Sequence, residues 1–239
     1  MTDTSAMATV VLVHGAFADA SGWAGVIREL QAADRIVVAP PNPQRGLVAD
    51  AEALKPLVAA IAGPVVLVGH SYGGAVITQA SAGLDNVVGL VYLAGFGLDI
   101  GESVADVQAP FAPPLLASNA RPTPYDAAGA AGGPDLYIDG KTFRETFCAD
   151  LPVDVAEFMA VSQRPLSAAA FTEKCTAAGW RTRPSWFLVS EHDNAIPPDA
   201  ERFFAERMKA TTEEINGSHC AFISQPVAVA NFIKKALAG

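Results

Sequence analysis

The sequence predicts an α/β fold with a mostly parallel, doubly wound sheet of about six strands, helices on both faces and a small helical cap. Short apolar runs rich in β-branched residues do not alternate with polar residues, which is typical of strands buried on both faces of a parallel sheet. Helical patterns separate these runs, and such alternation indicates right-handed crossovers. A length of 239 residues suits one domain, residues 1–239, of this kind.

Each predicted element follows from its local pattern. The expected strands are Thr9–His14, Ile36–Ala39, Val65–Gly69, Val87–Ala94, Ser185–Ser190 and a weaker Glu213–Ile215. The expected helices are Ser21–Ala33, Leu47–Ala62, Gly73–Ala82, Asp199–Ala210 and Pro226–Leu237. Ser21 is a suitable N-cap, and Pro226 fits a first helical turn, where a missing N–H does no harm.

Residues 96–164 break this alternation. They carry no strand signal, and prolines and glycines are dense in their first half. Short helices are expected at Lys141–Ala149 and Val153–Gln163. Because long insertions in compact domains are usually functional or disordered, we interpret residues 96–164 as a cap over the strand ends.

Composition and charge limit the classes of molecule that the protein is expected to bind. Apolar residues make up 51% of the chain, and 16 basic against 25 acidic residues give a net charge of −9 without a basic cluster. This argues against nucleic acid and anionic membranes, so the expected partner is a small molecule, and a homodimer is left open. No phosphate loop or metal-ligand pattern is present, so we expect no metal and no cofactor. Three irregularly spaced cysteines and no signal-peptide pattern favour the cytoplasm.

The most informative stretch is Val65–Ile77, which reads VVLVGHSYGGAVI. A Gly-x-Ser-x-Gly sequence after a buried strand and before a helix is the nucleophile elbow, in which a strained turn exposes the serine hydroxyl. Small residues such as Gly73 allow the helix to pack close to the strand, and the first N–H groups of the helix can stabilise an anion. Ser71 is therefore the predicted nucleophile.

A serine nucleophile needs a base and an acid that orients it. His219 lies in a loop near the end of the chain, where a base could reach Ser71. Asp193 follows the strand Ser185–Ser190 and fits the chain order serine, acid, histidine. Asp99 follows an earlier strand and competes with Asp193 for the role of acid.

Acyl transfer also requires donors for an oxyanion. The backbone N–H of Tyr72, after the nucleophile, is one candidate, and the loop after the first strand supplies the other from Ala16 or Phe17, of which we favour Phe17. His14 is expected to brace this loop through hydrogen bonds. The residues expected to contact substrate at these strand ends are Gly15, Ala16, His70 and Phe96.

The ordered motifs together resemble the α/β-hydrolase superfamily. They are VVLVHGAF at the first strand, VVAPPNP after the second, LVGHSYGGAV at the elbow, LVSEHDNAIPP at the acid and INGSHCAFISQP at the base. Among superfamily members, the compact chain resembles small bacterial esterase-like proteins related to plant hydroxynitrile lyases and methylesterases.

The resemblance implies a cofactor-free serine hydrolase acting on small, mainly apolar esters. It implies Ser71, His219 and Asp193 as the triad, with oxyanion amides at Phe17 and Tyr72. Hydroxynitrile lyases of the plant type use a lysine near the site, and no lysine here clearly matches it, since Lys209 lies inside a predicted helix. Lyase-like or perhydrolase chemistry in the same cleft, and a ligand receptor on this fold, are the alternatives.

Overall fold

Six parallel strands form the central sheet, in the order β2-β1-β3-β4-β8-β9. The computed structural model describes residues 7–125 and 133–238; residues 1–6, 126–132 of the predicted cap, and 239 lie outside the described part. The strands are β1 (Thr9–Val13), β2 (Val37–Val38), β3 (Val65–His70), β4 (Val87–Leu93), β8 (Ser185–Ser190) and β9 (Thr211–Ile215). Every residue of β1 and β3 is buried, as apolar runs without alternation predict. The predicted α/β fold is thus confirmed.

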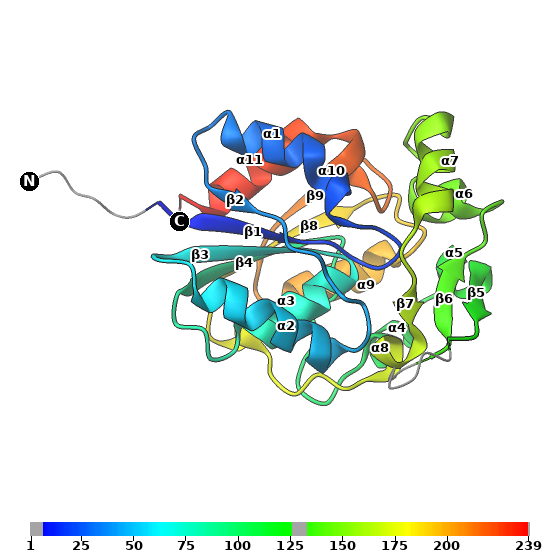
Figure 1. The fold of residues 1–239 in the computed structure, drawn as a ribbon, viewed down its shortest axis with the longest axis horizontal. Helices are drawn as coiled ribbons and strands as arrows, with labels where there is room; N and C mark the ends of the chain where they lie inside the picture. The colour runs from blue at the N-terminus through cyan, green and yellow to red at the C-terminus, as the bar shows by residue number, and fades with distance from the viewer. Residues whose placement is uncertain (1–6, 126–132, 239) are drawn as a thin grey trace, which may run out of the picture.

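Helices cover both faces of the sheet (Figure 1). The 3-10 turn η1 (Ala20–Trp23), α1 (Ala24–Gln31), α10 (Ala221–Ser224) and α11 (Pro226–Ala236) lie together on one face. The helices α2 (Leu47–Ala59) and α3 (Tyr72–Ser81) pack together on the other face, and α9 (Pro198–Arg207) packs against β8. Among the described residues, no helix is both long and apolar enough to cross a membrane.

The cap lies beyond the carboxyl ends of the strands (Figure 1). Its helices are α4 (Val104–Gln108), α5 (Leu115–Asn119), α6 (Phe143–Phe147) and α7 (Val153–Ser162). The chain returns to the sheet through α8 (Ala168–Thr172) and the 3-10 turn η2 (Gly179–Arg181).

The cap also contains strands, which the sequence did not predict. An antiparallel sheet joins β5 (Ala120–Thr123), β6 (Asp135–Ile138) and β7 (Leu166–Ser167). Because β7 belongs to this sheet, the sheet extends past residue 164, where the predicted cap ends. These strands have at most four residues, and β5 contains Pro122, which is tolerated because β5 is an edge strand. Elements this short leave no periodic pattern in the sequence. At the edge of the central sheet, β2 is likewise shorter than the predicted strand Ile36–Ala39.

The chain order of the sheet creates a crevice. From β1 the chain crosses outward to β2 and then returns to the other side of β1 with β3. The register places Val13 beside Gly69 and His70 beside Leu93, so β1, β3 and β4 end at the same edge. Ligands of doubly wound sheets bind where the strand order reverses in this way. The segments that follow β1 and β3 meet there.

Close packing of backbone holds this edge together. A Cβ atom on Gly73, in the first turn of α3, would lie 2.3 Å from the Val13 carbonyl oxygen. A Cβ atom on Gly69 would lie 2.5 Å from the Gly73 oxygen. Real Cβ atoms do not approach backbone so closely, so glycine at these positions lets α3 lie directly against β1 and β3.

Gly73→Ala is expected to lower the free energy of unfolding by about 1–3 kcal/mol, as overpacking does. Alanine favours a helix over glycine, so without the backbone contact the substitution would stabilise α3. Denaturant unfolding followed by circular dichroism measures the change. Gly140→Ala is the matched control, because nothing lies within 4 Å of its added Cβ. Equal effects of the two substitutions would contradict the packing argument.

Candidate active site

Ser71 occupies a strained turn between β3 and α3. Its φ of 55° and ψ of −123° are rare for a residue other than glycine. Three backbone hydrogen bonds hold the turn: the Ser71 amide donates to the Leu93 oxygen at 3.2 Å, and its carbonyl accepts from Gly74 at 2.9 Å and Phe96 at 3.1 Å. The sequence pattern of a nucleophile elbow therefore corresponds to a strained turn at Ser71.

His219 and Asp193 meet in the interior beside this turn. His219 Nδ1 lies 2.5 Å from Asp193 Oδ2, and both side chains are almost completely buried. The other Asp193 oxygen, Oδ1, accepts from the amides of Ala195 at 2.6 Å and Ile196 at 2.8 Å. These amides fix the carboxylate so that Oδ2 faces the imidazole.

Asp99, the competing acid, lies elsewhere. Its carboxylate forms an ion pair with Arg181, with Arg181 Nε 2.8 Å from Asp99 Oδ1, on a partly exposed surface. The structure thus brings Asp193 to His219 and directs Asp99 to a different partner.

His219 Nε2 is buried and has no hydrogen-bond partner within residues 7–125 and 133–238. The structure therefore contains no hydrogen bond between this nitrogen and the Ser71 hydroxyl. The His219 ring nevertheless lies close to the elbow, because its centroid is 4.6 Å from that of His70, the neighbour of Ser71.

His70 is buried at the elbow, and the expectation that it contacts substrate stays a prediction. Its side chain is fully buried, its Nε2 donates to the His219 carbonyl oxygen at 2.9 Å, and its ring packs against Phe222. Burial, followed by the nearby His219, holds the pKa of His70 well below its ordinary value. His70 is thus a neutral donor that fixes the backbone of His219.

Asp150 in the cap also holds the His219 loop, a role that the sequence did not reveal. Its Oδ2 accepts from the Ser218 amide at 3.1 Å and from the Ser224 hydroxyl at 2.7 Å, and its Oδ1 accepts from the Ser218 hydroxyl. Burial would raise the pKa of Asp150, but the hydrogen bonds from Ser218 and Ser224 outweigh it and lower that pKa. No local pattern connects residues 68 positions apart.

The loop after β1 presents Phe17 with a φ of 60°. Within the described part of the chain, neither the Phe17 amide nor the Tyr72 amide donates a hydrogen bond. Both amides therefore lack a hydrogen-bond partner among the described residues, and both residues line the recess at Ser71. Gly15 packs directly on the elbow, since a Cβ atom there would lie 2.6 Å from the Ser71 Cβ.

His14 and Gln44 brace this loop from within. His14 Nε2 accepts from the Asn42 amide at 2.9 Å, so the ring proton lies on Nδ1, which is 3.0 Å from the Gly15 oxygen. Gln44 Nε2 donates to the same Gly15 oxygen at 2.7 Å. Burial lowers the pKa of His14, which keeps it neutral. The sequence predicted the bracing role of His14, but it gave no signal for Gln44.

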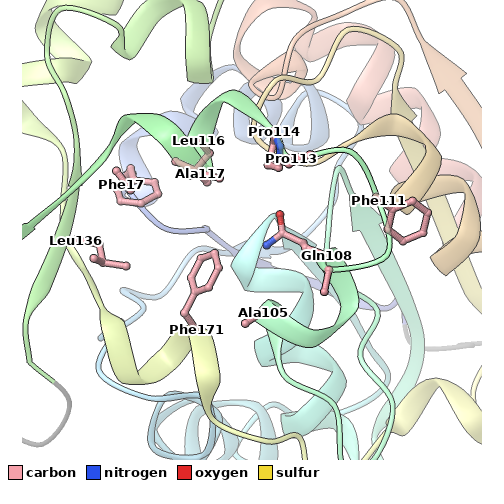
Figure 2. A pocket seen from close by; sticks show the side chains of 12 residues that line it. Phe17, Ala105, Gln108, Phe111, Pro113, Pro114, Leu116, Ala117, Leu136 and Phe171 are labelled. Carbon is pink, nitrogen blue, oxygen red and sulfur yellow. The ribbon is translucent and has the colours of Figure 1, made fainter.

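A narrow recess leads to Ser71. Its walls include Ala16 and Phe96, two residues expected to contact substrate, together with Phe17, Leu116 and Phe171. The last three residues also line a larger cavity of about 410 Å³ between the core and the cap (Figure 2). Gln108 is the one polar side chain among the residues that line this cavity. Ser71 thus lies in a recess whose walls are partly shared with a larger apolar chamber.

Comparisons with known proteins agree with this architecture. A family model described as the alpha/beta hydrolase family matches residues 10–232. A probable hydrolase, R7, from Phoma sp. is 28% identical over 238 residues, which cover 91% of this chain and 93% of the relative.

Two solved structures show the same fold. A polyneuridine aldehyde esterase superposes with a TM-score of 0.82 at 20% identity, covering 96% of this chain and 99% of that chain. A pyrethroid hydrolase from Sphingobium faniae JZ-2 gives a TM-score of 0.80 at 20% identity, covering 97% and 98%. The superfamily resemblance read from the sequence motifs is confirmed, and the chain belongs to the alpha/beta hydrolase family.

Proposed function

We propose that the protein is a serine hydrolase that cleaves small, mainly apolar carboxylic esters through an acyl-enzyme. The observation that carries the proposal is the 2.5 Å contact between His219 and Asp193 beside the strained turn at Ser71. A serine hydroxyl is a weak nucleophile, and an oriented imidazole is the usual means of activating it. The hydrolase relatives and the esterase with this fold support the same reaction class.

The chemical steps follow from the roles of these residues. His219 Nε2, the ring nitrogen that Asp193 leaves free, takes the Ser71 proton as Oγ attacks the ester carbonyl. The amides of Phe17 and Tyr72 stabilise the oxyanion. His219 then protonates the departing alcohol and activates the water that releases the acid. Asp193 holds the imidazole and stabilises its charged form throughout.

The cavity supports an apolar, uncharged substrate. None of the residues that line it is charged, and its volume of about 410 Å³ falls within the usual range for small-molecule sites. A charged substituent would lose its hydration there without a partner, which costs free energy. An ester whose larger group is apolar would fill the chamber and present its carbonyl group at the recess.

A fluorophosphonate probe is expected to label wild-type protein at Ser71 and to leave Ser71→Ala unlabelled, with the adduct located by peptide mass spectrometry. The same substitution should reduce kcat on p-nitrophenyl esters by about 10⁴-fold or more. Ser162→Ala, in exposed α7, is the matched control and should react as wild type does. Near wild-type turnover by Ser71→Ala would overturn the scheme, and labelled protein that cleaves no ester would exclude esters as substrates.

Asp193→Asn is expected to lower kcat on the same ester by about 10⁴-fold, because an amide cannot hold the imidazole in its productive tautomer. Asp99→Asn is the matched control. It removes a partly exposed ion pair with Arg181 and should change kcat little. Stopped-flow or steady-state assays of both variants, checked for native circular dichroism, decide between the two acids. A larger loss in Asp99→Asn would reverse the assignment.

A further inference from the structure

Glu201 is a fully buried carboxyl group that the proposed reaction does not use. It lies in the first turn of α9 and has no exposed surface. One oxygen, Oε2, accepts a hydrogen bond from the Ser190 amide at 3.0 Å, and the other, Oε1, has no donor among the described residues. An ionised carboxylate in such a place would have one hydrogen bond and no cation, which is strongly unfavourable.

The neighbouring charges do not compensate Glu201. Arg202, next along α9, turns outward and pairs with Glu214 at 2.7 Å and with Asp199 at 3.0 Å. The carboxyl group that acts on Glu201 in the interior is instead that of Asp193, whose negative charge adds to the effect of burial and raises the pKa of Glu201. The two residues meet at Ser190, because the Ser190 amide donates to Glu201 and the Ser190 carbonyl oxygen accepts from the Asp193 amide at 3.3 Å. His219 lies beyond Asp193. Two adjacent carboxyl groups cannot both be ionised cheaply, so a pair of this kind holds a proton.

The hydrogen bonds indicate which carboxyl holds the proton. The Asp193 carboxyl accepts hydrogen bonds from two backbone amides and lies 2.5 Å from His219 Nδ1, so both of its oxygens already have partners. Glu201 receives a single amide hydrogen bond. Burial, followed by the charge of Asp193, raises the pKa of Glu201 well above its ordinary value. The unpartnered Oε1 is therefore the natural place for the proton.

We propose that Glu201 is a positioning residue that stays protonated at neutral pH and donates a hydrogen bond to Asp193. Its consequence for catalysis rests on the proposed function: Asp193, held from the α9 side, keeps Oδ2 on His219. Glu201 neither gains nor loses a proton during turnover. The protonation itself does not depend on which reaction the site performs.

The pH dependence of unfolding tests the proton without any assay of activity. Glu201 in the unfolded chain ionises near its ordinary pKa of 4.5, whereas the folded protein keeps the proton to higher pH. As pH rises above this value, the unfolded state alone releases the proton, so wild type loses stability relative to Glu201→Gln. The ratio of their unfolding equilibrium constants should change by about tenfold per pH unit until folded Glu201 ionises.

Urea unfolding of wild type and Glu201→Gln from about pH 5.5 to about pH 8 measures this slope. Glu206→Gln, which removes an exposed carboxylate from the same helix, is the matched control. The difference in free energy of unfolding between wild type and Glu206→Gln should not vary with pH. A flat difference for Glu201→Gln as well would overturn the protonated state.

Turnover tests the positioning role. Glu201→Gln keeps a donor toward Asp193, so it should retain most of the activity, with an unchanged acidic limb in the pH profile of kcat/KM. Glu201→Met loses the donor and should lower kcat by about tenfold to a hundredfold. If the acidic limb of kcat/KM shifts to lower pH in Glu201→Gln, the substitution has removed a negative charge, and Glu201 was ionised. If Glu201→Met keeps the wild-type kcat, Asp193 does not need a hydrogen bond from Glu201. Either result overturns the proposal.

The two hypotheses fail differently. If the wild-type protein cleaves no ester, the proposed function fails, while the unfolding experiment still reports on the proton of Glu201. If Glu201→Met does not fold, Glu201→Gln provides both the slope and the pH profile, and either can contradict the proposal.

Discussion

The strained turn at Ser71 depends on direct contact between backbones. A φ of 55° outside glycine costs free energy, and the turn persists because β1, α3 and the segment after β4 enclose it without intervening side chains. A Cβ atom at Gly15, Gly73 or Gly74 would collide with backbone or with Ser71 itself. The same contacts bring Phe17 and Tyr72 to the recess at Ser71. The strained turn at Ser71 and the approach of Phe17 to Tyr72 are thus two results of one packing constraint.

The polar groups around this turn lie in an apolar interior, where each needs a partner. His14 and His70 are kept neutral by burial and use their ring protons to fix the loops that carry Phe17 and His219. Asp193 is surrounded by amide donors and His219. In an interior of low polarity, a polar group that moves away from its partner costs free energy. The same interior that keeps the two histidines uncharged therefore also fixes the positions of these side chains.

The sequence predicted those features whose cause is local. Buried strands, the Gly-x-Ser-x-Gly turn and the order of Ser71, Asp193 and His219 follow from patterns within a few residues or from chain order. Contacts across the chain were not predictable, because the hydrogen bonds of Asp150 span 68 and 74 residues. Glu201 reads as an ordinary helix glutamate, and only the fold reveals its burial. The cap strands were missed because they are too short to show a period.

The cap and the core that carries Ser71 and His219 are not independent. Leu116 and Leu136 of the cap line the cavity together with Phe17 and Phe171 (Figure 2), so cap residues shape this cavity. Asp150 follows α6 in the same cap and holds the loop that carries His219. A change in cap packing therefore acts on the cavity and on His219 together. Under the proposed function, redesign of substrate preference through the cap must preserve Asp150, because a better-fitting cavity gains nothing if the His219 imidazole moves.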